Sequence, residues 1–266
     1  MNHKPFAAGP HTRTTTTAVT RVADGQWHAL EEDLVVGRGH AMRRPDGRLF
    51  VSIDAWHDAA FDQLADAMLT TLPAPLYTVA DEADLESRAG WQRAGFTIRR
   101  REWEYVVPTD PRVTGLEAIS PPPGVRTVPA GAADEDLLRA VDRAIRAEVE
   151  AGAGWQSMPA EVRPRCEGDT IIDPSLYTAA AAPDRYLGLL RLVTVTRRPR
   201  IGLIAVRAGE QRRGLAWAML ADALGRLHQC GIAAASAEVD QTNAAALALF
   251  EGIGGKRTGS SLELAR

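Results

Sequence analysis

The chain has 266 residues, 45% apolar and 24% charged, which suits one large domain or two small ones with a buried core. Acids outnumber bases by 34 to 31, which argues against a nucleic-acid partner, because phosphate contacts need a basic excess. No apolar run approaches the ~20 residues of a membrane span, so no membrane contact is expected. Cys166 and Cys230 make neither a disulfide framework nor a metal-ligand pattern, so we expect a cytoplasmic protein without metal.

The first residues have the composition of a tail. Residues 1–23 contain no acid and include four consecutive threonines. They lack the apolar stretch of a secretory signal and the arginine-rich stripe of a transit peptide. The sequence therefore predicts a partly disordered N-terminal tail over 1–23.

A proline-rich segment divides the remainder. Residues 109–123 end in three consecutive prolines, which cannot continue a helix and favour an extended conformation. We expect a linker there, between a first half at 24–108 and a second half at 124–266.

The second half alternates strand and helix patterns. Asp134 and Asn243 stand where N-cap residues precede apolar stripes, so each predicts a helix start. Apolar runs bounded by turn residues predict short strands. The fold class is therefore α/β (α+β), with a mixed, mainly antiparallel central sheet flanked by helices. The expected strands are 125–128, 176–180, 186–194, 200–206, 233–239 and 261–264, and the expected helices are 134–152, 214–229 and 243–251.

The first half repeats part of this pattern. Residues 64–68 (LADAM) match 220–224 (LADAL) at an offset of 156. Residues 91–95 parallel 250–254 at an offset of 159, in the same strand-helix context. The similar offsets favour a duplication, and hence two related halves.

The segment after the strand at 200–206 carries a chemical signal. Gly214 lets backbone approach a ligand closely, and the following helix start provides free N–H groups for an anion. Arg212 and Arg213 add positive charge, while the small Ala216 leaves space for a diphosphate. The spacing matches neither a Walker P-loop nor a dinucleotide-binding fingerprint.

Two motifs resemble one superfamily. The Gln-x-x-Gly-x-Ala segment at 211–216 is similar to the pyrophosphate loop of the GCN5-related N-acetyltransferases (GNAT). Residues 238–254 are similar to that superfamily's second signature. The resemblance covers 124–266, and 24–108 resembles a degenerate copy, so the whole resembles a tandem GNAT protein.

The resemblance implies a binding mode for acetyl-CoA as co-substrate. The pantetheine arm would bind backbone near Ile204 and Val206, and Asn243 would point toward that arm. The pyrophosphate would be held by the loop and the first helical turn. The residues implied there are Gln211, Arg212, Arg213, Gly214, Leu215, Ala216 and Trp217.

The resemblance also implies a reaction in which an amine of a small molecule or peptide attacks the thioester directly. Glu238 is the first candidate for the general base, with an outward-facing or structurally paired carboxylate as the alternative. Phe250 stands where many relatives have a tyrosine acid, and phenylalanine has no donor. Tyr177 and Tyr186 are alternatives to Glu238, although tyrosines in strands usually pack.

Charge is unevenly distributed around these motifs. Between Arg185 and Arg213 there are eight arginines and one acid, a local field that would attract CoA. Acids dominate between Glu148 and Asp173, which would suit a cationic amine or form an ordinary charged surface. In the first half, Ala55 and Asp58 replace the loop's glutamine and glycine, so no CoA loop is expected there.

Three functions remain open on the sequence. N-acetyl transfer leads, followed by a non-catalytic acyl-CoA-binding or regulatory module, which Phe250 favours, and by an acyltransferase with a longer donor. The acceptor is not specified by the sequence, nor is the choice between monomer and homodimer.

Overall fold

The structure is a computed structural model that describes residues 17–44, 46–152, 173–194 and 198–266. In the first half the chain runs through a meander of strands, two helices and a last long strand. Its elements are β1 (Ala18–Ala23), β2 (Gln26–Glu31), β3 (Leu34–Arg43), β4 (Leu49–Ala55), α1 (Asp58–Thr71), β5 (Leu76–Asp81), α2 (Leu85–Arg93) and β6 (Thr97–Pro108).

The second half repeats this order with an added helix before its meander. Its main elements are α3 (Pro111–Thr114), β7 (Arg126–Val128), α4 (Glu135–Ala151), β8 (Tyr177–Ala181), β9 (Tyr186–Val193), β10 (Arg200–Val206), α5 (Leu215–Gln229), β11 (Ala234–Asp240), α6 (Ala244–Gly252) and β12 (Lys256–Ala265). Short 3₁₀ turns lie at η1 (Leu116–Ala118), η4 (Pro174–Leu176) and η5 (Ala208–Glu210). The fold is mixed α/β with a mainly antiparallel sheet and two related halves, as the sequence predicts.

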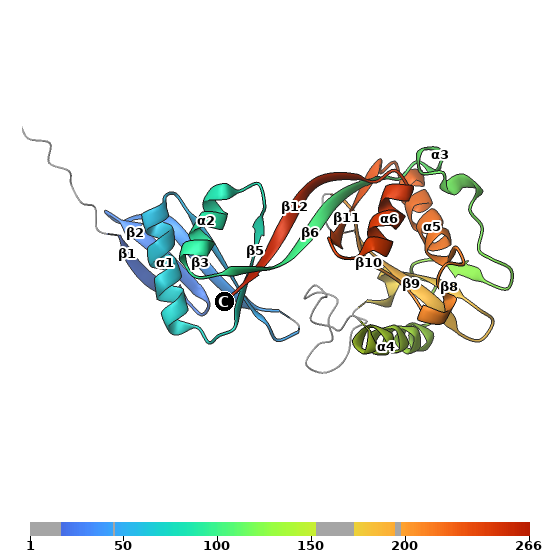
Figure 1. Cartoon of the computed structure of the whole chain (residues 1–266), viewed down its shortest axis with the longest axis horizontal. Helices are drawn as coiled ribbons and strands as arrows, with labels where there is room; N and C mark the ends of the chain where they lie inside the picture. The colour runs from blue at the N-terminus through green and yellow to red at the C-terminus, as the bar shows by residue number, and fades with distance from the viewer. Residues whose placement is uncertain (1–16, 45, 153–172, 195–197) are drawn as a thin grey trace, which may run out of the picture.

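The twelve strands of the described residues form one sheet, in the order β1-β2-β3-β4-β5-β12-β6-β11-β10-β9-β8-β7. The last strand of each half has crossed over: β12 pairs with β5 of the first half, and β6 pairs with β11 of the second. The two exchanged strands also pair with each other, and they form the long ribbon that joins the halves in Figure 1.

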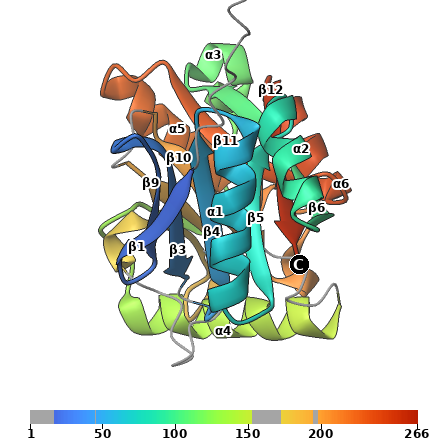
Figure 2. The same cartoon turned by 90° about the vertical axis from the view of Figure 1, so that its left-hand side faces the viewer.

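The exchanged strands complete each other's cores. Leu262 and Leu264 of β12 lie with α1 and α2 in the first-half core. Tyr105 and Val107 of β6 lie with α5 and α6 in the second-half core. Figure 2 shows α1 and α2 on the near side of the first-half sheet. A separate cluster holds α4 against β8 and β9, on the sheet face opposite α5.

Local signals account for the element boundaries in the second half. Asp134 and Asn243 cap α4 and α6 through side-chain hydrogen bonds to Leu137 N and Ala246 N, so both predicted caps are confirmed. The strand at Arg200–Val206 has the predicted bounds. The last strand is longer than predicted, because its N-terminal part pairs with β6 from the other half.

Two expected boundaries differ in the structure. Residues Ala18–Ala23, expected in the tail, form strand β1 against β2; their exposed pattern gave no core signal. The expected linker 109–123 is packed, not free: Thr109 is fully buried and its Oγ1 donates to Ile232 O at 2.5 Å. Leu116 joins the second-half core. The halves are therefore two lobes of one sheet.

Replacing Leu262 by alanine tests the exchange. This side chain is fully buried in the first-half core although it lies near the end of the second half. We expect the free energy of unfolding to fall by about 2–5 kcal/mol in urea denaturation. The matched control, Leu34→Ala, removes a leucine that is 64% exposed and should cost less than about 0.5 kcal/mol. Equal effects of the two substitutions would contradict the exchange.

Candidate functional site

The second-half sheet opens between β10 and β11. These parallel strands pair only at Arg200↔Ser236 and Ile201↔Ala237. At Gly202 the register of β10 against β9 shifts by a β-bulge, and beyond it β10 stays with β9 while leaving β11. The edge of β10 that faces β11 is therefore free over the part that holds Ile204 and Val206. An extended ligand chain can hydrogen-bond to such an edge as an added strand.

The segment after β10 exposes a helix start to this opening. Arg212 and Gly214 both have a positive φ, 63° and 84°, and turn the chain into α5. Gly214 is the N-cap, and no side chain caps the helix. The first-turn N–H groups, which include those of Leu215, Ala216 and Trp217, therefore lack a side-chain acceptor, and the helix dipole adds a positive potential. An anion is the natural occupant of such a site.

The side chains of this loop divide between exposed and packed positions. Gln211, Arg212, Arg213 and Gly214 are exposed. Leu215 is buried, so it can serve a ligand through its backbone only. Trp217 lies against α6, since a Cβ built on Gly252 would be 3.3 Å from its ring. The Gln211 amide donates to Val206 O at 3.3 Å and fastens the loop to the end of β10.

Glu148, at the end of α4, anchors the start of the loop. Its carboxylate accepts from Arg207 Nε at 2.6 Å and from Ala208 N at 2.7 Å. Burial raises the pKa of Glu148, but the hydrogen bonds from Arg207 and Ala208 outweigh it and leave the pKa below its usual value. The sequence groups Glu148 with the acidic residues between Glu148 and Asp173. In the structure its carboxylate instead holds the start of the loop through hydrogen bonds.

Of the other acidic residues between Glu148 and Asp173, some lie in the described part of the chain and some do not. Asp173 accepts from both Ser175 N and Ser175 Oγ and so caps a 3₁₀ turn. Glu161, Glu167 and Asp169 lie outside the described residues.

Most of the expected basic field is paired. Arg213 and Arg185 both contact Glu210, and Arg207 is held by Glu148. Within the described part of the chain, Arg212 has no hydrogen-bond or ion-pair partner and projects from the loop itself. It is the arginine best placed to meet an anion beside the start of α5.

Glu238 lies at the point where the two strands diverge. It follows Ala237, the last residue of β11 that pairs with β10. Ala237 and Val239 face the core below α5, so Glu238 points to the opposite face of the sheet, where it is exposed. Arg200 Nη1 donates to its Oε2 at 3.2 Å. The carboxylate is thus both paired and open to solvent at the mouth of the gap.

No tyrosine hydroxyl with an available proton lies beside Phe250 in the described residues. Phe250 is buried and stacks on Tyr105 with ring centroids 6.0 Å apart. The Tyr105 hydroxyl donates to Glu251 at 3.0 Å and accepts from Arg257 at 2.8 Å, and burial chiefly raises its pKa. Its proton is therefore engaged. Tyr177 and Tyr186 are buried in the cluster below α4, and the Tyr186 hydroxyl accepts from Asp134 N at 2.9 Å.

Asn243 is the N-cap residue of α6. Its Oδ1 accepts from Ala246 N at 3.0 Å, which leaves its amide NH₂ for another partner. Its predicted contact with the pantetheine arm stays a prediction.

The first half contains the same opening without the anion site. β4 and β5 pair only at Leu49↔Leu76 and Phe50↔Tyr77, as β10 and β11 do at their own start. At the start of α1, however, the His57 side chain accepts from Ala60 N at 3.2 Å, and Asp58 adds negative charge to the first turn. A side chain thus occupies the position that is open in α5.

Comparisons with known proteins give a family match for part of the chain and a fold similarity for nearly all of it. Residues 145–254 match the model of the acetyltransferase (GNAT) family. No curated protein matches the sequence well enough for comparison.

Solved structures of similar fold cover nearly the whole chain. One is a GCN5-related N-acetyltransferase from Sphaerobacter thermophilus, with 16% identity and a TM-score of 0.60. The match covers 93% of this chain and 82% of that one. A tandem GNAT protein from the clavulanic acid biosynthesis pathway has 14% identity, a TM-score of 0.63 and coverages of 94% and 83%. A GCN5-related N-acetyltransferase from Kribbella flavida has 14% identity, a TM-score of 0.57 and coverages of 95% and 90%.

Residues 145–254, in the second half, thus match the acetyltransferase (GNAT) family, and the chain as a whole has a fold similar to that of a tandem GNAT protein. The description of that family names acetyl transfer as the activity of its members. No helix among the described residues could cross a membrane. No group of three or more His, Cys, Asp or Glu in the described ranges is arranged to hold a metal ion.

The contact between α4 and the loop predicts the effect of Glu148→Gln. The amide cannot pair with Arg207 as a charge, so the loop loses order and CoA should bind about 5–10-fold more weakly in titration calorimetry. Because the pKa of Glu148 is held below its usual value, the anchor should persist at neutral pH and fail only as the pH falls through that lowered pKa. Asp136→Asn, an exposed change on the same helix, is the control. An unchanged affinity in Glu148→Gln would show that the anchor is unnecessary.

Proposed function

We propose that the second half transfers an acetyl group from acetyl-CoA to an amine of a small molecule or peptide. The observation that carries the proposal is the uncapped start of α5 directly beside the open edge of β10. A pyrophosphate suits the uncapped helix start, and an extended pantetheine arm suits the open edge of β10. A Cβ built at Gly214 would find open space within 4 Å, which leaves room for a ligand's phosphates there.

The proposed reaction needs one proton acceptor. The amine nitrogen attacks the thioester carbonyl, the carbon–sulfur bond breaks, and the sulfur leaves as a thiolate. Glu238 takes the amine's proton, directly or through a water, from its place at the mouth of the gap. Because a thiol has a reference pKa near ~8.5, the thiolate can leave without an acid, which is compatible with Phe250 and the engaged Tyr105.

Phe250 also favours a second candidate, a module that binds acyl-CoA without catalysis. Consumption of acetyl-CoA with a panel of amines separates the two. We place either activity in the cytoplasm on cysteine usage, since Cys166 and Cys230 form no disulfide framework in the sequence.

Gly214→Asp tests the anion site. We expect one CoA per chain, bound in the second half, and at least about 100-fold weaker binding in the variant, because a carboxylate would lie beside the pyrophosphate. The φ of 84° strains any side chain, so some loss of stability should accompany the change.

Gly214→Asn is the matched control, because it has the same shape and the same strain without the charge. Calorimetry on both variants isolates the electrostatic effect. Equal affinities of the Asp and Asn variants would mean that the pyrophosphate lies elsewhere, and two equivalent CoA sites would contradict the loss of the first-half site.

Glu238→Gln tests the base. We expect kcat to fall by about 10²–10⁴-fold with little change in CoA affinity, and the remaining rate to rise with pH as the amine itself deprotonates. Glu104→Gln is the control, since Glu104 lies opposite Glu238 in the register of β6 and β11 but one strand further from the gap. It should change kcat less than about tenfold. A similar loss in both variants would indicate a charge effect and not a base.

A further inference from the structure

Asp240 ends strand β11 between two residues of the proposed site. Glu238, the proposed base, lies two positions before it, and Asn243, the N-cap of α6, lies three positions after it. The Asp240 Oδ1 atom accepts hydrogen bonds from Thr242 N at 2.7 Å and from Thr242 Oγ1 at 2.5 Å. The Asp240 carbonyl accepts from Asn243 N at 3.0 Å. The position of Asp240 therefore fixes the turn from β11 into α6.

A cation from the first half contacts the other oxygen of that carboxylate. Arg100 belongs to β6, and its side chain is only 7% exposed. Its Nε lies 3.0 Å from Asp240 Oδ2, and its Nη2 contacts Glu102. The contact with Asp240 is an ion pair and not an aligned hydrogen bond. Arg100 is thus a buried charge that joins β6 to the end of β11.

The cation offsets a repulsion between two carboxylates. Glu102 of β6 lies directly opposite Asp240 in the antiparallel register with β11, and like charges in such positions destabilise a sheet. Arg100 contacts both carboxylates. Removing one partner of a buried charge pair leaves the remaining charge uncompensated. Without Arg100, the repulsion should therefore move the end of β11 away from β6.

The end of β11 is positioned by β6 rather than by β10. β11 pairs with β6 along its whole length, Ala234–Asp240, but with β10 at two residue pairs only. Gln241 N continues the ladder by donating to Arg101 O at 3.0 Å. A shift of β11 against β6 would therefore move Glu238 and the start of α6 relative to the open edge of β10.

We propose that Arg100 is a positioning residue for acetyl transfer, supplied by the first half. It acts through Asp240, which holds the proposed base Glu238 and the Asn243 amide at their places beside the open edge of β10. A misplacement of about 1 Å can cost about 10²-fold in rate, so a small shift of β11 suffices. This inference rests on the proposed function, and it gives the first half a part in the reaction.

Arg100→Gln removes the charge and keeps most of the side-chain length. We expect kcat/KM for acetyl-CoA to fall about tenfold or more, with a lower kcat from the displaced base and a higher KM from the displaced amide. In the ligand-free protein, the amide NMR signals of Glu238, Thr242 and Ala246 should shift, since Ala246 N donates to Asn243 Oδ1.

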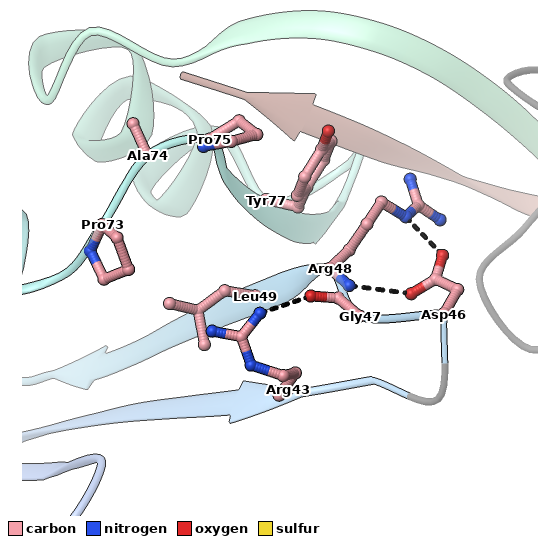
Figure 3. Close-up of a pocket in the computed structure, with 9 residues that line it drawn as sticks. All are labelled: Arg43, Asp46, Gly47, Arg48, Leu49, Pro73, Ala74, Pro75 and Tyr77. Carbon is pink, nitrogen blue, oxygen red and sulfur yellow. Dashed lines mark hydrogen bonds and ion pairs between the residues drawn. The ribbon is translucent and has the colours of Figure 1, made fainter. Parts of the chain in front are cut away.

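Arg48→Gln is the matched control. Arg48 is also a buried arginine of the first half, and its Nη1 lies 3.0 Å from Glu263 of the second half. Figure 3 shows it beside Asp46, which its Nε contacts at 2.7 Å. Loss of Arg48 should lower the thermal midpoint of unfolding as Arg100→Gln does, but kcat/KM should stay within about threefold and the amide signals at the end of β11 should not shift.

Two further variants separate positioning from a general loss of folding. Arg100→Lys keeps the positive charge and should recover most of the activity. Asp240→Asn breaks the same ion pair from its other side, while its Oδ1 can still accept from Thr242. It should reproduce the loss in kcat/KM. The double variant Arg100→Gln/Asp240→Asn should lie within about twofold of either single variant, because two residues in contact are not additive.

The outcomes distinguish this inference from the acetyl-transfer proposal. An unchanged kcat/KM in Arg100→Gln, losses equal to those of Arg48→Gln, or additive losses in the double variant would each overturn the positioning role. If the unmodified chain neither binds CoA nor consumes acetyl-CoA, the acetyl-transfer proposal fails. The amide signals of the ligand-free protein then still decide whether Arg100 positions the end of β11.

Discussion

The exchange of β6 and β12 is the constraint on which the rest of the structure depends. Each half supplies the strand that closes the other half's sheet, so neither core is complete alone. The exchange also carries side chains across. Tyr105, from the first half, stacks on Phe250 and accepts a hydrogen bond from Arg257. Glu263, from the second half, pairs with Arg48 of the first. The first half therefore contributes to the second, because its strand β6 completes the sheet beside the gap.

A difference at one helix start separates two otherwise similar halves. Both open their sheets after two parallel residue pairs, and both continue into a helix. In α5 the N-cap is Gly214, which has no side chain to satisfy the first N–H groups. In α1 the cap is His57, whose ring accepts from Ala60 and also contacts Glu31. Both halves thus place a helix start after the opened strand, but the turn differs: Gly214 has a φ of 84° and His57 is extended at −156°. Of these two helix starts, only that of α5 has no side-chain cap.

The sequence predicted those features that depend on neighbouring residues. The caps at Asp134 and Asn243, the strand at Arg200–Val206 and the loop before Gly214 each have a local signal. The strand exchange has no local signal, because strand pairing joins residues that are far apart in the sequence. The sequence therefore predicts a last strand that is shorter than the one observed. The sequence predicts a tail where β1 lies, because the mostly exposed residues of this strand carry no apolar pattern. Glu148 was missed as an anchor because it acts on Arg207, 59 positions away.

The pairing of the arginines shows what the proposed binding would rest on. The sequence suggested attraction by a dense basic field, yet Arg213, Arg207 and Arg200 are each held by a carboxylate. Arg212 has no partner in the part of the chain that the structure describes. The remaining positive potential comes from backbone N–H groups at the start of α5, which act only in a fixed geometry. Affinity would then depend on loop order more than on net charge. The loop is ordered by contacts at its two ends, Glu148 from α4 and the packing of Trp217 on α6. A residue remote from the ligand, on a helix across the sheet, thus belongs to the same physical unit as the loop.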